Sequence, residues 1–201
     1  MPFFLRPHLN TLRLAGVSLY LLLIIGTLLF QAAAPVYGQS QIITQIGGDI
    51  DGEAALNFSG GSVASSYRGD TVAIGASGNY DNGNDAGHVR VFVRRGNTWS
   101  QLGGDIDGEA GKDNSGSSVS LSSDGRRVAI GAIGNSGNAR FAGHVRVYEL
   151  NARNTWTQLG ADIDGEAVMD FSGNSVSLSS DGRRVAIGAY QNDGNGLRSG
   201  H

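Results

Sequence analysis

The chain has 201 residues, a formal net charge of −3 and no cysteine, so it cannot form disulfides or use thiol chemistry. The weak negative charge and the lack of a basic stripe argue against a nucleic-acid-binding protein. Its 32 glycines are about twice the ordinary usage, and they recur at fixed positions rather than in a low-complexity tract.

The first 38 residues have the composition of an export signal. Arg6 and Arg13 precede a charge-free, mostly apolar run at 14–30, and small residues follow up to Gly38. This order predicts a secretory signal peptide with cleavage after Gly38. The run is close to the minimum length for a helix that crosses a bilayer, so an uncleaved anchoring helix is the alternative. We therefore expect a secreted or cell-surface protein that touches the membrane only if this segment is uncleaved, and then only through it.

Residues 39–201 consist almost wholly of one repeated sequence. Its copies span 43–98, 99–155 and 156–201, and the third copy is incomplete. The first copy has 56 residues and the second has 57, and the extra residue falls after a histidine that every copy contains. A length change confined to one place indicates a surface loop, because a slip inside a strand would turn its side chains to the wrong face.

Each complete copy contains four short predicted strands and no helical periodicity. In the second copy the alternating run 117–122 is followed by the tight-turn residues 123–125 and by the short apolar run 127–132. A loop rich in Asn and Gly comes next, and two further strands lie at 143–148 and 155–159. Four-stranded antiparallel units at this period predict blades of a β-propeller. The expected fold class is therefore all-β, a partial propeller of about two and a half blades.

The repeat resembles the FG-GAP repeat, the blade of the integrin α-subunit headpiece and of many surface proteins. The resemblance covers residues 43–201 and rests on Ser-Gly-x-Ser-Val, Asp-Gly and Val-Ala-Ile-Gly-Ala. The segments that match the two halves of the family motif are Phe58–Gly60, Phe171–Gly173, Ile74–Ala76, Ile130–Ala132 and Ile187–Ala189. The resemblance implies an extracellular propeller that presents loops to protein or carbohydrate partners, but it does not identify the ligand.

The calcium loop of many FG-GAP repeats is incomplete in this chain. Between the first two strands the family has Asp-x-Asp-x-Asp-Gly, and this chain has 65–70, 122–127 and 179–184, which lack that set of carboxylates. A single carboxylate is too few for calcium, which takes six to eight oxygen ligands. The family's metal site is therefore not carried over.

Each copy also has an Asp-x-Asp-x-Glu triplet near its start, and the triplets hold half of the 18 acidic residues. One interpretation is a calcium site, with ligands drawn from Asp105, Asp107, Glu109, Asp113, Asp162, Asp164, Glu166 and Asp170. The preferred interpretation is a connection between blades. Its acids would be solvated or paired with the hairpin arginines Arg126, Arg127, Arg183 and Arg184. We therefore assign no metal and no other cofactor.

No residue of the sequence has the setting of a catalytic group. His88, His144 and His201 begin equivalent strands, and blades spread equivalent positions around a ring, so we expect structural histidines that do not share one metal. The chain has no nucleophile-elbow motif and no phosphate loop between a strand and a helix. Asn57 begins an N-glycosylation acceptor pattern, which matters only in a eukaryotic secretory pathway.

These observations predict a non-catalytic interaction or adhesion module whose ligand is an extracellular protein or a carbohydrate. The alternatives are a truncated fragment of a larger propeller protein and an accessory domain of an extracellular hydrolase. About four to eight blades close a propeller, so two and a half blades leave faces and strand edges open, which promotes self-association. A strand expected at 43–46 has no blade of its own and would complete the last blade of a closed ring.

Overall fold

The computed structural model describes residues 44–201. The predicted signal peptide at 1–38, with its apolar run at 14–30, lies outside the described residues. The described chain is all-β, since twelve strands form antiparallel sheets and no segment of 44–201 is helical. Consequently this part of the chain offers no helix that could cross a membrane.

The first sheet contains the four strands predicted for one repeat and a short fifth strand. The four pair as antiparallel neighbours in chain order, and the fifth returns to pair with the beginning of the third. The strands are β1 (Ser62–Ser65), β2 (Thr71–Ala76), β3 (His88–Arg95), β4 (Thr98–Gln101) and β5 (Ile106–Asp107).

The second sheet repeats this arrangement, with β10 returning to the beginning of β8. Its strands are β6 (Ser115–Leu121), β7 (Arg127–Ala132), β8 (His144–Leu150), β9 (Trp156–Gln158) and β10 (Ile163–Asp164). The third sheet is a pair, formed by β11 (Ser172–Leu178) and β12 (Val185–Ala189). The prediction of four-stranded antiparallel units is thus confirmed for the first two repeats.

The strand expected at 43–46 is not formed at its described residues, 44–46. Its counterparts at Trp99 and Trp156 belong to β4 and β9, which pair with β3 and β8. Among the described strands none precedes 44–46 to offer the same ladder, and an unpaired extended segment is not stable as a strand. The segment contacts the first sheet instead, because the indole nitrogen of Trp99 donates to the carbonyl oxygen of Ile46 at 3.2 Å.

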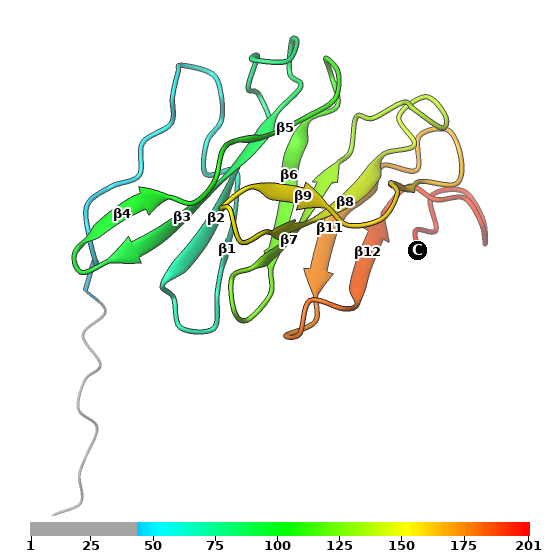
Figure 1. Ribbon diagram of the computed structural model, residues 1–201. Helices are drawn as coiled ribbons and strands as arrows, with labels where there is room; N and C mark the ends of the chain where they lie inside the picture. Colours follow the sequence, from blue (N-terminus) through cyan, green and yellow to red (C-terminus); the bar gives the residue numbers. More distant parts are fainter. Residues whose placement is uncertain (1–43) are drawn as a thin grey trace, which may run out of the picture. The chain divides into compact units, whose positions relative to one another are not determined.

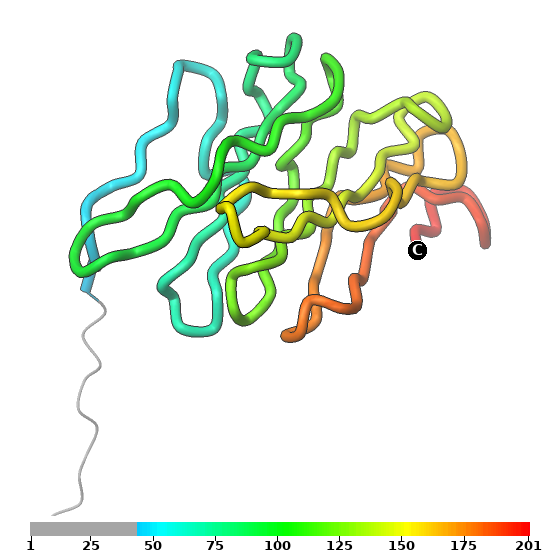
Figure 2. The backbone as a smooth tube through the Cα atoms, in the orientation of Figure 1, coloured from blue at the N-terminus to red at the C-terminus, as the bar shows by residue number. Residues whose placement is uncertain are grey.

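Neighbouring sheets pack face to face through very small residues. Figures 1 and 2 show the sheets side by side in chain order, with β6 against β1 and β2, and β11 against β6 and β7. A Cβ atom on Gly75 would lie 2.1 Å from the carbonyl oxygen of Gly116, and one on Gly131 would lie 2.1 Å from that of Gly173. The glycines of the first two Ile-Gly-Ala motifs are therefore required by the backbone of the next sheet.

The apolar core lies between the first two sheets. Alternate residues of β2, β3, β6 and β7 point into it, as expected for strands with one face toward a neighbouring sheet. Its buried members are Ala73, Val89, Val91, Ile106, Val119, Leu121, Val128 and Ile130, and Trp156 packs against them from β9.

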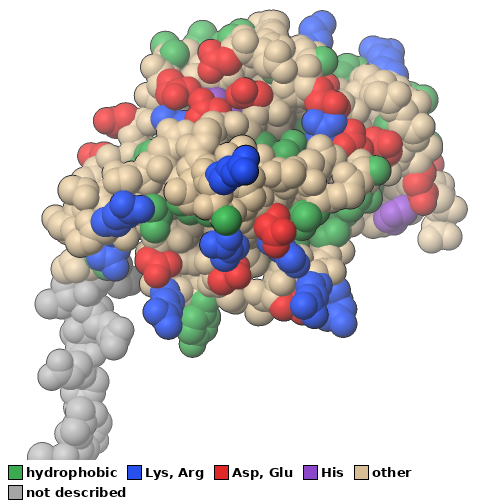
Figure 3. Space-filling view, viewed as in Figure 1, with side chains coloured by type: hydrophobic (Ala, Val, Ile, Leu, Met, Phe, Trp, Pro, Cys, Tyr) green, Lys and Arg blue, Asp and Glu red, His purple; other side chains and the backbone are tan. Residues whose placement is uncertain are grey.

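The two ends of the sheets hold different connections. The tight hairpins β1–β2, β6–β7 and β11–β12 lie at the lower end in Figure 1, and the longer connections lie at the upper end. Buried Asn79, Asn135 and Asn192 order these longer loops, because each side-chain oxygen accepts a backbone N–H two residues on at 2.9 Å. Figure 3 shows many Asp and Glu side chains gathered over this upper end.

Candidate functional site

The acidic triplets are held against the histidine strands at the upper end. In the second sheet the short ladder of β10 on β8 places Asp164 opposite His144, and in the first sheet β5 places Asp107 opposite His88. The triplets at 105–109 and 162–166 are thereby fixed to a strand edge and are not free loops. In each case the acids at the start of one repeat lie beside the histidine of the preceding repeat, and together they form a cluster.

Arginine fills the cluster of the second sheet. The guanidinium of Arg146 donates from Nε and Nη2 to the two carboxylate oxygens of Asp162, both at 2.8 Å, and it also pairs with Glu109. These hydrogen bonds lower the pKa of Asp162 from 3.8 to about 2. They also raise the pKa of Arg146 above its ordinary value, although burial opposes this. Because Glu109 lies on the β5–β6 connection and Asp162 precedes β10, the cluster joins two successive repeats.

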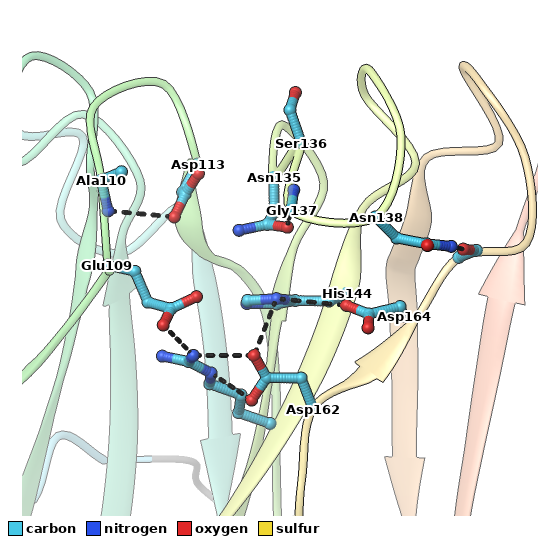
Figure 4. Close-up of polar contacts among 12 residues, drawn as sticks. Glu109, Ala110, Asp113, Asn135, Ser136, Gly137, Asn138, His144, Asp162 and Asp164 are labelled. Atoms are coloured by element: carbon cyan, nitrogen blue, oxygen red, sulfur yellow. Dashed lines mark hydrogen bonds and ion pairs between the residues drawn. The ribbon is translucent and has the colours of Figure 1, made fainter.

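His144 lies beside these ion pairs without a hydrogen bond to its Nδ1 atom. The residue is 3% exposed, and Nδ1 lies 3.8 Å from Asp162 and 3.9 Å from Asp164 (Figure 4). Burial, and then the charge of Arg146, lower the pKa of His144 below 6.5. The imidazole is therefore neutral at pH 7.

The equivalent cluster of the first sheet is arranged differently. Arg90 donates from Nη2 to the carbonyl oxygen of Asp51 at 2.7 Å, and its Nη1 lies 3.4 Å from Glu53. Asp105, the counterpart of Asp162, has no ion pair with an arginine among residues 44–201. Burial, and then the charge of Asp105, raise the pKa of nearby Asp107. This cluster thus holds an excess of carboxylate charge.

Among the described residues, two groups have the composition and spacing of metal ligands. The first consists of Glu53, Asp81, His88 and Asp105, and the second of Glu109, His144 and Asp162. Within each group, one ligand atom of every residue lies within 4.8 Å of the others. Asp105, Glu109 and Asp162, which the sequence offered as calcium ligands, therefore each lie in a group that also contains a histidine.

Asp113 and Asp170 stabilise their own loops. Both are buried, and their Oδ2 atoms accept backbone N–H groups from Ala110 at 3.1 Å and Ala167 at 2.9 Å. They lie outside both groups of potential metal ligands. Asn57, at the same position of the first repeat, is 4% exposed, so a glycan on its amide would have to displace packed neighbours. Asp107 and Asp164 lie opposite His88 and His144 in the short ladders, and both are exposed, as Glu166 is.

The hairpin arginines do not pair with the triplets. Arg127 pairs with Glu149 at 2.8 Å, and Arg126 donates to the carbonyl oxygen of Leu150 at 2.8 Å. These residues follow the tight hairpins at the opposite end of the sheets, which is why the expected pairing is wrong. The actual partners, Arg90 and Arg146, follow the repeated histidine by two positions, and this regularity could have identified them.

A groove lies between the loops of the second repeat at the same end. It has a volume of about 540 Å³ and is lined by residues 109–113, residues 134–137, Arg140 and Phe141. Beside it runs an aromatic row, defined as Phe141, Phe171 and Tyr190. The ring centroids are 6.0 Å apart for the first pair and 5.7 Å for the second, and both pairs are stacked. The repeat did not predict the row because its members occupy different repeat positions.

No protein-family model and no curated protein match the chain. Its function is therefore inferred from the fold, the clusters and the aromatic row.

Proposed function

We propose that the chain is part of an extracellular FG-GAP-like β-propeller that binds carbohydrate through its loop end and performs no catalysis. The blade interpretation is supported by sheets of the same strand order that pack face to face through glycine. The extracellular location is inferred from the signal-like sequence of residues 1–38. Protein ligands, which the resemblance equally implies, are the alternative occupants of the same surface.

The observation that carries the carbohydrate proposal is the aromatic row beside the groove. The face of an aromatic ring is electronegative and attracts the weakly positive C–H groups on one side of a sugar ring. Tyr190, at one end of the row, is 51% exposed. At the other end the guanidinium of Arg140 lies over the ring of Phe141, 5.1 Å from its centroid, so Tyr190 is the ring of the row most open to a sugar. Stacking surfaces with adjacent hydrogen-bonding groups suit an extended sugar chain, whose rings are apolar on their faces and polar at their edges.

The proposal is tested with the full chain and a panel of neutral, acidic and basic soluble polysaccharides, with binding measured by calorimetry. At least one polysaccharide is expected to bind, and Tyr190→Ala and Phe171→Ala are each expected to weaken this binding about tenfold, equivalent to about 1.4 kcal/mol. Tyr190→Ala should disturb the fold less than Phe171→Ala, because the side chain of Tyr190 is more exposed than that of Phe171.

The matched control is Tyr67→Ala, because Tyr67 is an 88% exposed aromatic residue on the hairpin at the opposite end. This variant should bind as the wild type does. If no polysaccharide binds, the carbohydrate assignment is wrong. If binding survives both aromatic substitutions in folded protein, the ligand lies elsewhere on the molecule.

A further inference from the structure

Four side chains, three from the first repeat and Asp105 from the start of the second, converge at the upper end of the first sheet. Glu53 precedes β1, Asp81 lies in the β2–β3 connection, His88 begins β3 and Asp105 lies between β4 and β5. One ligand atom from each lies within 4.8 Å of the others. The set offers one nitrogen donor and three carboxylates.

The histidine supplies an observation that is independent of the acidic residues. His88 is 1% exposed, and its buried Nδ1 atom has no hydrogen-bond partner. The nearest carboxylate oxygen, on Glu53, is 3.8 Å away, which is beyond hydrogen-bonding distance. A buried polar atom without a partner carries a desolvation cost, and a ligand between the nitrogen and the carboxylates would remove it.

Comparison with the second cluster distinguishes this site from a general feature of the repeat. There Arg146 holds both Asp162 and Glu109, so the place between the carboxylates is already taken by a cation. In the first cluster Arg90 is directed to the carbonyl oxygen of Asp51 and contacts only Glu53 among the acids of the described chain. The carboxylates of Asp81 and Asp105 are thus not neutralised by arginine.

Asp81 is the second difference between the clusters. Its counterpart in the second repeat is Gly137, so only the first cluster has the fourth ligand. The side-chain amide of Asn79 donates to Asp81 Oδ2 at 2.9 Å, and the side chain of Gln101 donates to Asp105. These hydrogen bonds orient the carboxylates, as outer partners commonly do for metal ligands.

We propose that Glu53, Asp81, His88 and Asp105 bind one divalent transition-metal ion, of which Zn²⁺ is the representative. A nitrogen donor combined with carboxylates suits Zn²⁺ better than Ca²⁺, which takes oxygen ligands. Zinc bonds of about 2.0–2.2 Å place tetrahedral ligand atoms about 3.3 Å apart, so the side chains close in around the ion. The three carboxylates are exposed, and this gives the ion access from solvent.

The test uses the full chain after removal of metals by a chelator, with ZnCl₂ added in a calorimeter. We expect one Zn²⁺ per chain and a melting temperature that rises with Zn²⁺ concentration. Asp81→Asn should weaken Zn²⁺ binding at least about tenfold without altering the metal-free fold, because the second repeat has glycine at this position. Asp162→Asn in the second cluster is the matched control and should leave Zn²⁺ affinity unchanged.

Cobalt provides a readout of the histidine ligand. Co²⁺ bound to the full chain should show visible absorption bands that His88→Gln alters, and an excess of Ca²⁺ should not displace the ion. Absence of saturable binding, equal affinity in the wild type and Asp81→Asn, or an equal loss in Asp162→Asn would each overturn the proposal. If His88→Gln does not fold, the comparison of the two Asp→Asn variants still decides it. Displacement by an equal concentration of Ca²⁺ would contradict the transition-metal assignment.

Discussion

The hydroxyl of Ser118 donates a hydrogen bond of 2.7 Å to the backbone carbonyl oxygen of Gly173, and so links the second sheet to the third. Ser62 makes the same 2.7 Å bond to Gly116, between the first sheet and the second. Each bond forms where a glycine lets the two backbones approach closely. Sheet stacking in this chain is therefore specified by a serine and a glycine at fixed repeat positions.

We predict that Gly131→Ala destabilises the chain severely. A Cβ atom there would lie 2.1 Å from the carbonyl oxygen of Gly173, and the second and third sheets would have to separate. A loss of about 3 kcal/mol in the free energy of unfolding is expected, as for a badly overpacked core. Chemical denaturation followed by tryptophan fluorescence measures it.

Gly188→Ala is the matched control for Gly131→Ala. Gly188 occupies the same repeat position, but its Cβ atom would meet within 4 Å only Ser175, whose hydroxyl at 2.4 Å can rotate away. The expected loss is under about 1 kcal/mol. Equal losses in the two variants would show that the glycine is required by the strand itself and not by the neighbouring sheet.

A second prediction concerns the two tryptophans, which occupy equivalent positions. The indole nitrogen of Trp156 donates to the carbonyl oxygen of Leu102 at 2.8 Å, and its ring packs against the apolar core. Trp99 makes the equivalent bond at 3.2 Å in an exposed setting. Trp156→Ala should therefore cost about 3 kcal/mol, and Trp99→Ala about 1 kcal/mol. Thermal unfolding followed by circular dichroism compares them, and a larger loss for Trp99→Ala would contradict the core assignment.

The ion pair of Asp162 gives a third prediction, on acid stability. Hydrogen bonds from Arg146 lower the pKa of Asp162 from 3.8 to about 2 in the folded chain. The contact therefore contributes its full stability above the unfolded value of 3.8, and it loses this contribution as the pH falls to about 2. Asp162→Asn should be less stable than the wild type at pH 7, and the difference should shrink through this window.

Urea titrations at several pH values measure the difference in the free energy of unfolding between the wild type and Asp162→Asn. Glu166→Gln is the control, because Glu166 is exposed and makes no ion pair with another described residue, so this variant should follow the wild type. If the difference in the free energy of unfolding between the wild type and Asp162→Asn stayed constant down to pH 2, the ion pair would not be its cause.

The sequence predicted the strand order of each complete repeat, because strand alternation and tight turns are local properties. It did not predict the returns of β5 and β10, since two-residue strands have no recognisable period. These returns bring the triplets beside His88 and His144, so the clusters were not foreseen. Asp81 was not predicted for a different reason: the second repeat has Gly137 at this position, and repetition identifies only residues that recur.

The last prediction concerns the open faces of the first and third sheets. Ser175 and Gly188 occupy the positions of Ser118 and Gly131, but their face of the third sheet is not covered by another described sheet. On the first sheet Val63 is 68% exposed. The interface repeated twice within the chain shows what fits such a face, and we propose that a second copy stacks there head to tail. Light scattering after size exclusion should therefore show oligomers of the full chain that increase with concentration.

Gly188→Ala tests whether the copies associate through the open face of the third sheet. The added methyl group should leave the folded chain intact, as argued above, but it would obstruct an approaching backbone as a methyl group on Gly131 would. The variant should therefore be more monomeric than the wild type, whereas Ser136→Ala, at the loop end, should associate normally. Oligomers that persist unchanged in Gly188→Ala would mean that another surface, such as the apolar run at 14–30, holds the copies together. A monodisperse wild-type monomer would contradict the stacking altogether.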